Sequence, residues 1–452
     1  MRNVRVAVVG SGPAAFYAAG YLLASERPLE VDMIERLPTP WGLVRLGVAP
    51  DHPKLKEVSR AFERIAQRPG FRFLGNVEVG KFVSHDELMR AYDAVVYAVG
   101  AQTDRRLGIP GEDLPGSWSA TELVAWYNGH PDFQDLPFDL AVERAVVVGN
   151  GNVALDVARM LALTREELAP TDTTDPAIEA IVASPIEEIV VLGRRGPVQA
   201  SWTPAELAEL GELGGADVLL DPGELELDPA SELELAASTA IVKRNFDVLR
   251  EFGGRAPTGK PRAIRLRFRV SPVAILGSEQ VEGVEIVHNR LEPDASGAVR
   301  AVSTDERQIV PAGIVFRSVG YHGVALPGTP FDELTGTMPN VGGRVLDASG
   351  TPIPGLYCAG WIKRGPTGVI GTNKKDATET VDLLLADLDS GALSTGERSL
   401  DLESLLAERG VDVISYEGWE RIDKLERTRG ADQSRPRIKL ASWKELVDAG
   451  RN

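Results

Sequence analysis

The stretch that decides the fold is Gly10-Ser11-Gly12-Pro13-Ala14-Ala15. Before it, residues 4–9 are mostly β-branched and predict a buried parallel strand, and after it residues 13–25 are rich in alanine and predict a helix. Glycines such as Gly10 and Gly12 at this kind of turn let the backbone approach a pyrophosphate, which the N–H groups of the helix N-terminus then bind. With a further strand predicted at residues 31–35, the chain begins as a βαβ unit that binds a dinucleotide.

An acidic residue, Glu35, stands at the end of that second strand. A carboxylate in this place accepts hydrogen bonds from ribose hydroxyls and repels a 2′-phosphate. The glycine turn and the acidic strand end together predict a nucleotide with a free ribose, and FAD and NAD both fit these residues.

The same pattern starts again with a strand at residues 145–149 and the turn Gly149-Asn150-Gly151-Asn152-Val153-Ala154. A helix is predicted at residues 152–163 and the next strand at 188–193, where Arg194 and Arg195 follow in place of the glutamate. Guanidinium groups bind a phosphate through paired hydrogen bonds and keep their charge. We therefore expect the second site to bind the 2′-phosphate of NADP, the alternative being a solvated strand end.

Two copies of one supersecondary unit predict an α/β protein with two Rossmann-like domains. Further buried strands are expected at residues 92–100, 313–320 and 355–360, and a helix should run on to about residue 388. We expect the second domain, residues 108–325, to be inserted into the first, which comprises residues 1–107 and 326–452. A surface loop rich in glycine and serine is expected at residues 390–399, before a mainly helical tail.

Composition narrows the function further. The 452 residues carry a net charge of −17, which argues against nucleic acid or an anionic membrane as the main partner. The single cysteine, Cys358, excludes an intrachain disulfide and a dithiol redox centre. The sequence shows neither a secretory signal nor an apolar run long enough for a membrane span, so a cytoplasmic protein is expected.

Longer motifs carry a resemblance to a known family. They are Trp41-Gly42-Leu43-Val44-Arg45, Gly47-Val48-Ala49-Pro50-Asp51-His52-Pro53-Lys54, and residues 361–377, which read WIKRGPTGVIGTNKKDA. With residues 150–156 and 193–199, they resemble the adrenodoxin reductase family, in its bacterial NADPH–ferredoxin reductase branch, over nearly the whole chain. The resemblance implies a glutathione-reductase-type fold without the active disulfide, in agreement with the single cysteine.

The resemblance also implies roles for individual residues. The implied FAD contacts are Ala14, Glu35, Leu43, Val79, Trp361, Gly368, Val369 and Ile370. The implied NADP contacts are Asn150, Gly151, Asn152, Val153, Arg194, Arg195, Glu206 and the shared Gly368. Residues 368–370 could alternatively be a glycine-rich turn that opens a core helix, and Trp361 could serve packing alone.

The resemblance also implies that three polar residues lie near the redox centre, where they would orient the carboxamide or shuttle a proton. They are His52, Asp156 and Glu206. His52 precedes a proline in a loop, so a role in stabilising the turn is an equally natural reading.

The resemblance implies a ferredoxin–NADP reductase, a monomer that takes hydride from NADPH onto FAD and passes single electrons to a ferredoxin, an adrenodoxin-like [2Fe–2S] protein or another iron–sulfur protein. An acidic partner needs a local basic surface on this acidic chain. Candidates are Lys243, Arg244, Arg250, Arg255, Lys260 and Arg262, and the group Lys363, Arg364, Lys374 and Lys375. The rival functions are the NADPH-oxidising subunit of a glutamate-synthase-type complex, which usually has cysteine-rich clusters, and a non-catalytic flavin- and NADP-binding redox sensor.

Overall fold

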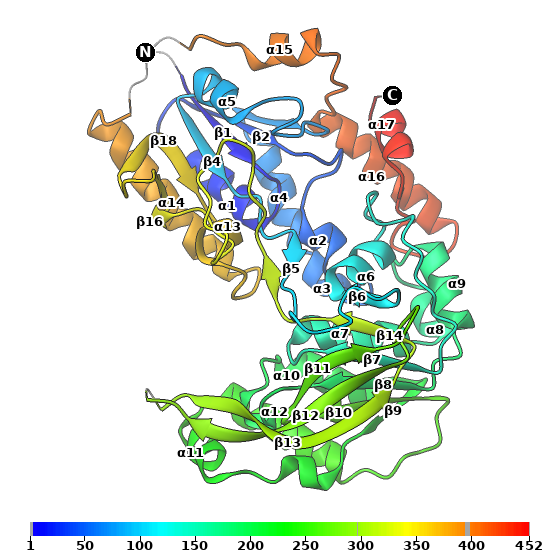
Figure 1. Ribbon diagram of the computed structural model, residues 1–452. Coiled ribbons are helices and arrows are strands. Elements are labelled where there is room, and N and C mark those ends of the chain that lie inside the picture. Colours follow the sequence, from blue (N-terminus) through cyan, green and yellow to red (C-terminus); the bar gives the residue numbers. More distant parts are fainter. Residues whose placement is uncertain (1–2, 296, 394–397, 452) are drawn as a thin grey trace. The chain divides into compact units, whose positions relative to one another are not determined.

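A computed structural model describes residues 3–295, 297–393 and 398–451. It divides the chain into two compact units, each with its own sheet. Unit 1 comprises the residues up to 103, residues 128–134 and the residues from 320 on, and unit 2 comprises residues 104–127 and 135–319. The predicted α/β fold, with a second Rossmann-like unit inserted into the first, is confirmed (Figure 1). The divisions fall a few residues before the expected boundaries at 107 and 325.

Unit 1 is built on a seven-stranded sheet in the order β16-β17-β18-β4-β1-β2-β3, in which the strands from β18 to β3 are parallel. Its strands are β1 (Val4–Val9), β2 (Leu29–Ile34), β3 (Phe71–Leu74), β4 (Ala94–Tyr97), β16 (Asn340–Val341), β17 (Arg344–Leu346) and β18 (Pro352–Cys358). A two-stranded sheet joins β5 (Thr103–Asp104) and β15 (Tyr321–His322), where the chain passes between the units. The strand expected at 92–100 is shorter and covers only Ala94–Tyr97, and Gly100, which follows it, has a positive φ of +74°.

The helices of unit 1 connect these strands and form the C-terminal tail. They are α1 (Pro13–Leu22), α2 (Leu43–Leu46), α3 (Pro53–Lys56), α4 (Ser59–Ala66), α5 (His85–Ala91), α13 (Trp361–Arg364), α14 (Thr372–Asp389), α15 (Leu402–Glu408), α16 (Tyr416–Ala431) and α17 (Trp443–Arg451). The tail is helical as predicted, while residues 394–397 of the expected surface loop lie outside the described residues.

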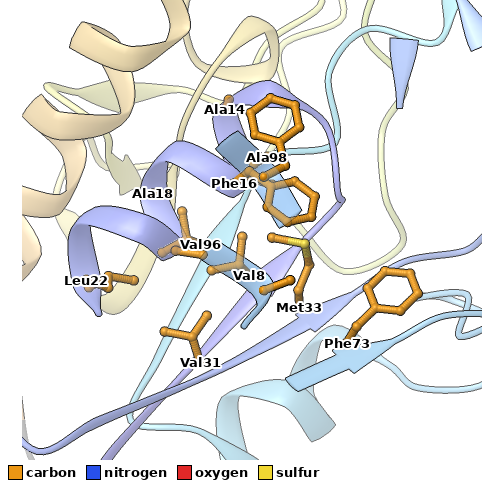
Figure 2. Close-up of a cluster of buried hydrophobic side chains, with 14 of the residues drawn as sticks. Val8, Ala14, Phe16, Ala18, Leu22, Val31, Met33, Phe73, Val96 and Ala98 are labelled. Carbon is orange, nitrogen blue, oxygen red and sulfur yellow. The ribbon is translucent and has the colours of Figure 1, made fainter. Parts of the chain in front are cut away.

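Both faces of the unit 1 sheet are buried, as a parallel sheet requires. Along β1, Val6 and Val8 belong to the apolar cluster under α1, and Ala7 and Val9 to the cluster on the other face. This alternation follows from the two-residue period of a strand. Figure 2 shows the first cluster, where Phe16 of α1 packs among side chains of β1 to β4.

The segment 128–134 belongs to unit 1 although it lies inside the range expected for the second domain. Its side chains explain this placement. Asp132 accepts hydrogen bonds from Arg36 and from the indole N–H of Trp443, and Asn128 accepts one from Lys439 at 3.0 Å.

Unit 2 has a six-stranded parallel sheet in the order β6-β14-β7-β8-β10-β9 and an antiparallel ribbon, β11-β12-β13. Its strands are β6 (Ser117–Ser119), β7 (Arg144–Val148), β8 (Glu188–Leu192), β9 (Ala216–Leu219), β10 (Arg262–Arg267), β11 (Val270–Leu276), β12 (Gly283–Pro293), β13 (Val299–Pro311) and β14 (Ile314–Arg317). Its helices are α6 (Ala120–Tyr127), α7 (Asn152–Ala162), α8 (Arg165–Leu168), α9 (Asp175–Ala183), α10 (Pro204–Glu209), α11 (Pro229–Ala237) and α12 (Ala240–Gly253). Three short 3₁₀ turns complete it at Pro197–Gln199, Leu210–Glu212 and Pro222–Leu225.

In the part of the chain that the structure describes, no helix combines the length and the apolar character needed to cross a membrane.

Candidate dinucleotide-binding sites

The first glycine turn joins β1 to α1, and its geometry explains its first glycine. Gly10 has φ +101°, and a Cβ atom there would lie 2.6 Å from the carbonyl oxygen of Ala98, just after β4. Its N–H donates to the carbonyl of Ile34 at 2.8 Å. The turn is thus fixed at the carboxyl ends of three neighbouring strands, where parallel sheets bind their ligands.

The N-terminus of α1 is left open for a ligand. Its N-cap is Gly12, no side chain caps it, and its first turn contains no acidic residue. A Cβ atom on Gly12 would meet no atom within 4 Å. The glycine therefore leaves open space beside the turn and is not needed to make room for another part of the protein. By contrast, Ser84 and Glu87 close the N-terminus of α5 with a capping box. The uncapped N–H groups and open space of α1 fit a pyrophosphate.

Glu35 is oriented by its neighbours at the end of β2. One carboxylate oxygen accepts a hydrogen bond from the hydroxyl of Ser11 at 2.6 Å, and the other accepts one from the N–H of Leu37 at 3.0 Å. Burial raises the pKa of the Glu35 carboxyl, and the hydrogen bonds from Ser11 and Leu37 act in the opposite direction. The carboxylate beside the glycine turn fits the expected acceptor of ribose hydroxyls.

The segment 41–43 packs directly against this turn. The N–H of Trp41 donates to the carbonyl of Ser11 at 2.9 Å, and a Cβ atom on Gly42 would lie 3.0 Å from the Cα of Gly12. Both Trp41 and Gly42 have positive φ, +84° and +50°. Leu43, the expected flavin contact, begins α2 and is partly exposed.

A second segment, Gly360 and Trp361, packs against the same turn. Gly360 has φ +78°, and a Cβ atom there would lie 2.6 Å from the Cβ of Ala14. Its N–H donates to the carboxylate of Asp376 at 2.5 Å. The ring of Trp361 lies 5.1 Å from that of Tyr321, and among the described residues nothing accepts a hydrogen bond from its buried indole N–H.

The remaining expected flavin contacts come from two other segments of unit 1, residues 368–370 and Val79. Gly368, with φ +80°, and Val369, which is 60% exposed, precede α14, whose N-terminus no side chain caps. Ile370 packs against the apolar cluster of α1. Val79 is buried in the other cluster, in a segment that the hydrogen bond from the N–H of Val77 to the carbonyl of Glu35 holds beside β2.

The glycine turn of unit 2 repeats the first one. Gly149 has φ +145°, and a Cβ atom there would lie 2.1 Å from the carbonyl oxygen of Ser318, just after β14. Its N–H donates to the carbonyl of Leu192 at 3.0 Å. Gly151 is the uncapped N-cap of α7, and a Cβ atom on it would again meet nothing within 4 Å.

The residues around this second turn connect it to residues 201–203. The carbonyl of Asn150 accepts from the N–H of Ser201 at 3.0 Å, and the side-chain oxygen of Asn152 accepts from the N–H of Thr203 at 3.0 Å. Val153 follows in the first turn of α7. The four residues expected at the pyrophosphate are thus adjacent and held in place.

The two arginines directly follow β8. Arg194 is exposed and Arg195 is half-buried, and the guanidinium of Arg195 lies 3.5 Å from the carbonyl oxygen of Gln199. Burial and then the charge of Arg194 lower the pKa of the Arg195 guanidinium, Glu234 raises it, and Arg300 lowers it. The strand end therefore holds cations that repel each other, as a phosphate site does.

The three residues expected near the redox centre lie in different units, and each has structural partners. His52 is buried and precedes α3, where its carbonyl accepts from the N–H of Leu55. Asp156 forms an ion pair of 2.7 Å with the buried Arg159 on α7. Glu206 lies on α10 and accepts a hydrogen bond from the hydroxyl of Thr203 at 2.9 Å.

The sequence alone does not predict the contacts that shape the first glycine turn. Gly42 and Asp376 stand in the sequence only as parts of motifs, and Gly360 only as the end of a predicted strand, because nothing in their spacing predicts that both glycines meet the turn. Asp376 also lies 3.3 Å from the buried ammonium of Lys363. Lys363 therefore does not belong to an exposed basic surface, unlike Lys374 and Lys375 in the first turn of α14.

The expected basic cluster of unit 2 is also divided. Arg262 and Lys260 donate to main-chain carbonyls, including those of Leu161 and Leu213. The remaining four residues of the cluster, on or next to α12, are Lys243, Arg244, Arg250 and Arg255. They are exposed and stay candidates for docking, although Lys243 also donates to the carbonyl of Ala236.

Cys358 is fully buried in β18, and burial raises the pKa of its thiol to about 12. Within residues 3–295, 297–393 and 398–451, no group of three or more His, Cys, Asp or Glu side chains could hold a metal ion.

Comparison with known proteins places these sites in context. Residues 4–169 match the family model described as pyridine nucleotide-disulphide oxidoreductase. The chain is 50% identical to the NADPH-ferredoxin reductase FprA of Mycobacterium tuberculosis, over 100% of both chains. It is 41% identical to the mitochondrial NADPH:adrenodoxin oxidoreductase of Arabidopsis thaliana, over 100% of this chain and 96% of that protein. The structure of the M. tuberculosis FprA in complex with NADPH superposes with a TM-score of 0.94 at 49% identity, over 100% of both chains.

Proposed function

The chain belongs to the adrenodoxin reductase family, in its bacterial NADPH–ferredoxin reductase branch, and from this we propose that it oxidises NADPH and reduces a small iron–sulfur protein such as a ferredoxin. We assign FAD to the site of unit 1 and NADPH to the site of unit 2. Bound FAD supplies the chemistry that connects a two-electron donor to a one-electron acceptor. The protein supplies binding, orientation and the exclusion of water.

The observation that carries this proposal is the difference in charge between two sites whose glycine turns are built alike. In both sites, the first glycine packs against a main-chain carbonyl just after a neighbouring strand. The second glycine leaves open space at a helix N-terminus that no side chain caps. The strand ends differ in charge, with Glu35 at one and Arg194 and Arg195 at the other. Because a carboxylate repels a 2′-phosphate and guanidinium groups bind it, the two sites select different dinucleotides.

The residues around each turn then have distinct tasks. In unit 1, Trp361 has a buried N–H that its described neighbours leave for a ligand, and residues 368–370 would contact the flavin ring. In unit 2, residues 150–153 would bind the pyrophosphate of NADPH. We assign Asp156 and Glu206 to orienting the nicotinamide carboxamide, and His52 to moving or holding a proton near the flavin.

The partner is a small acidic iron–sulfur protein, either a ferredoxin or an adrenodoxin-like [2Fe–2S] protein. Exposed Lys374 and Lys375 stand in the first turn of α14, next to the expected flavin contacts. Their charges are unfavourable to the helix dipole, and an anionic partner would compensate them. We further propose that the enzyme is a cytoplasmic monomer.

The decisive experiment begins with an absorption spectrum of the purified protein. Oxidised-flavin bands that bleach on addition of NADPH support the reductase, and a colourless protein excludes it. Steady-state reduction of a panel of ferredoxins and of cytochrome c, with NADH as the control donor, then identifies the acceptor. Reduction of ferricyanide without reduction of any ferredoxin would identify an NADPH diaphorase that is not a ferredoxin reductase.

The nucleotide assignment has its own test. Replacing Arg194→Ala and Arg195→Ala together removes the proposed phosphate ligands, so KM for NADPH should rise at least about tenfold while KM for NADH changes little. An equal loss with both donors would refute the assignment of the 2′-phosphate.

A further inference from the structure

The antiparallel ribbon β11–β13 of unit 2 has no task in the proposed function, yet it holds the two arginines by their backbone. We call residues 193–199 the arginine loop. A Cβ atom on Gly196 of this loop would lie 3.2 Å from the side chain of Leu291 on β12. The ribbon is thus in direct contact with the loop.

The most specific contact comes from the buried amide of Asn289 on β12. Its side-chain N–H group donates to the carbonyl of Arg194 at 2.8 Å and to the hydroxyl of Ser271 on β11 at 2.8 Å. Its side-chain oxygen lies 3.4 Å from the hydroxyl of Ser303. Since a buried amide is costly unless it is hydrogen-bonded, this set of partners fixes the side chain and, with it, the carbonyl of Arg194.

The next residue of the loop is held by the ribbon as well. The N–H of Arg269 donates to the carbonyl of Arg195 at 2.9 Å, and the carbonyl of Arg269 accepts from the N–H of Asn289 at 2.6 Å. Arg269 has φ +55°, a conformation that residues other than glycine seldom adopt. Its guanidinium donates to the carbonyls of Gly223 and Glu226, which help to keep it there.

The ribbon is irregular at the same place. Val287 pairs with Arg307 but Asn289 pairs with Ser303, so three residues of β13, from Thr304 to Glu306, stand opposite the single residue between Val287 and Asn289. Such a bulge bends the ribbon and redirects its side chains. The bulge, the positive φ and the buried amide therefore all occur where the ribbon meets the arginine loop.

We propose that Asn289 is a positioning residue for nucleotide specificity, which sets the direction of Arg194 and Arg195 by holding the main chain of the arginine loop. The inference rests on the proposed binding of the 2′-phosphate of NADPH by these arginines. Without the amide, the carbonyl of Arg194 loses its partner and the loop is free to turn the guanidinium groups away. The contribution of the 2′-phosphate to binding falls, while the rest of the nucleotide binds as before.

The test uses the FAD-loaded, full-length protein and three variants. Asn289→Ala removes the amide, and Asn289→Leu does so at similar volume if the alanine variant folds poorly. Thr304→Val is the matched control, because it removes the hydrogen bond of 2.8 Å to the carbonyl of His288 in the same bulge without touching the loop. Calorimetry measures the binding of 2′,5′-ADP and of 5′-AMP, and steady-state kinetics with ferricyanide give KM for NADPH and NADH.

For Asn289→Ala or Asn289→Leu we expect about tenfold weaker binding of 2′,5′-ADP and an about tenfold higher KM for NADPH, with 5′-AMP, NADH and flavin content unchanged. Thr304→Val should resemble the wild type. Equal losses for 5′-AMP and 2′,5′-ADP, or no loss at all, would overturn the role of Asn289. The double variant Arg194→Ala, Arg195→Ala separates the two proposals. If the double variant keeps its preference for NADPH over NADH, the phosphate assignment fails. If the double variant loses this preference and the Asn289 variants keep it, the phosphate assignment stands and only the role of Asn289 fails.

Discussion

Arg45 and Glu426 form a bidentate ion pair with nitrogen–oxygen distances of 2.8 and 2.5 Å, although they lie near opposite ends of the chain. Both side chains are almost completely buried, and Glu426 also accepts a hydrogen bond from Arg437 at 3.0 Å. The guanidinium of Arg45 lies over the ring of Trp419, 5.1 Å from its centroid. Since Arg45 follows Leu43 in α2, the tail helix α16 holds the segment that packs on the first glycine turn.

This ion pair predicts a stability effect that reaches the FAD site. Glu426→Ala leaves Arg45 buried without its counter-charge, so the free energy of unfolding should fall by about 3–5 kcal/mol. Because the segment 41–43 then loses its support, we also expect the purified variant to retain less FAD. Denaturant unfolding and the ratio of flavin to protein absorbance measure the two effects.

An exposed ion pair in the same unit provides the control for Glu426→Ala. Asp389 pairs with Arg27 on the surface, and such pairs contribute about 0–1 kcal/mol. Asp389→Asn should therefore leave both unfolding and flavin content near those of the wild type. A Glu426→Ala protein that unfolds at the same denaturant concentration as Asp389→Asn would contradict the supporting role of the tail.

Much of the fold was predictable because its signals are local, and the two candidate sites are proposed from the same signals. A strand, a glycine turn and a helix follow one another within about 20 residues. The charge of Glu35 or Arg194 could be read directly at the next strand end. The alternation of Val6 and Val8 with Ala7 and Val9 likewise follows from a strand that is buried on both faces.

What the sequence did not reveal are contacts between distant segments. Gly360 packs on Ala14, and Glu426 on Arg45, through tertiary folding that no spacing rule encodes. The hold of Asn289 on the carbonyl of Arg194 depends on a shift of strand register, which single residues do not announce. The inclusion of residues 128–134 in unit 1 also depends on side-chain partners in the tail.

The two glycines of the second turn should fail in different ways when replaced. Gly151→Ala meets no protein atom within 4 Å, so unit 2 should fold normally, but the methyl group occupies the space that we assign to the pyrophosphate. Gly149→Ala would place its Cβ 2.1 Å from the carbonyl of Ser318 at a φ of +145°, which should destabilise the unit itself. We expect Gly151→Ala to weaken NADPH binding at least about tenfold at nearly unchanged melting temperature, and Gly149→Ala to lower that temperature.

The corresponding pair in unit 1 checks that this difference is general. Gly12→Ala should lose FAD without a steric clash inside the protein, whereas Gly10→Ala meets the carbonyl of Ala98. Titration of the apoproteins with FAD, together with their circular dichroism, distinguishes the two cases. If Gly12→Ala and Gly151→Ala bind their nucleotides as tightly as the wild type, the turns are not the pyrophosphate sites.

Cys358 should be chemically silent in the native enzyme. Its side chain is fully buried, and burial raises the pKa of the thiol to about 12, so almost no thiolate exists at neutral pH. We expect no labelling by iodoacetamide at pH 8 and complete labelling once the protein is unfolded in guanidinium. Electron transfer to ferredoxin should survive Cys358→Ala, and its loss in a folded, flavin-loaded variant would point to a redox role for the thiol.

His130 predicts a loss of stability in mild acid. Burial lowers the pKa of its imidazole from the usual 6.5, and the nearby charge of Arg36 acts in the same direction, against the effect of Asp132. Below pH 6.5 the imidazole of His130 therefore binds a proton in the unfolded chain, whereas in the folded protein it stays largely neutral. As a result, the free energy of unfolding decreases as the pH falls from 7 toward 5. His130→Gln removes this proton uptake, so its stability should depend less on pH over that interval. Urea unfolding of both proteins at several pH values measures the two slopes, and equal slopes would show that His130 titrates alike in the folded and unfolded states.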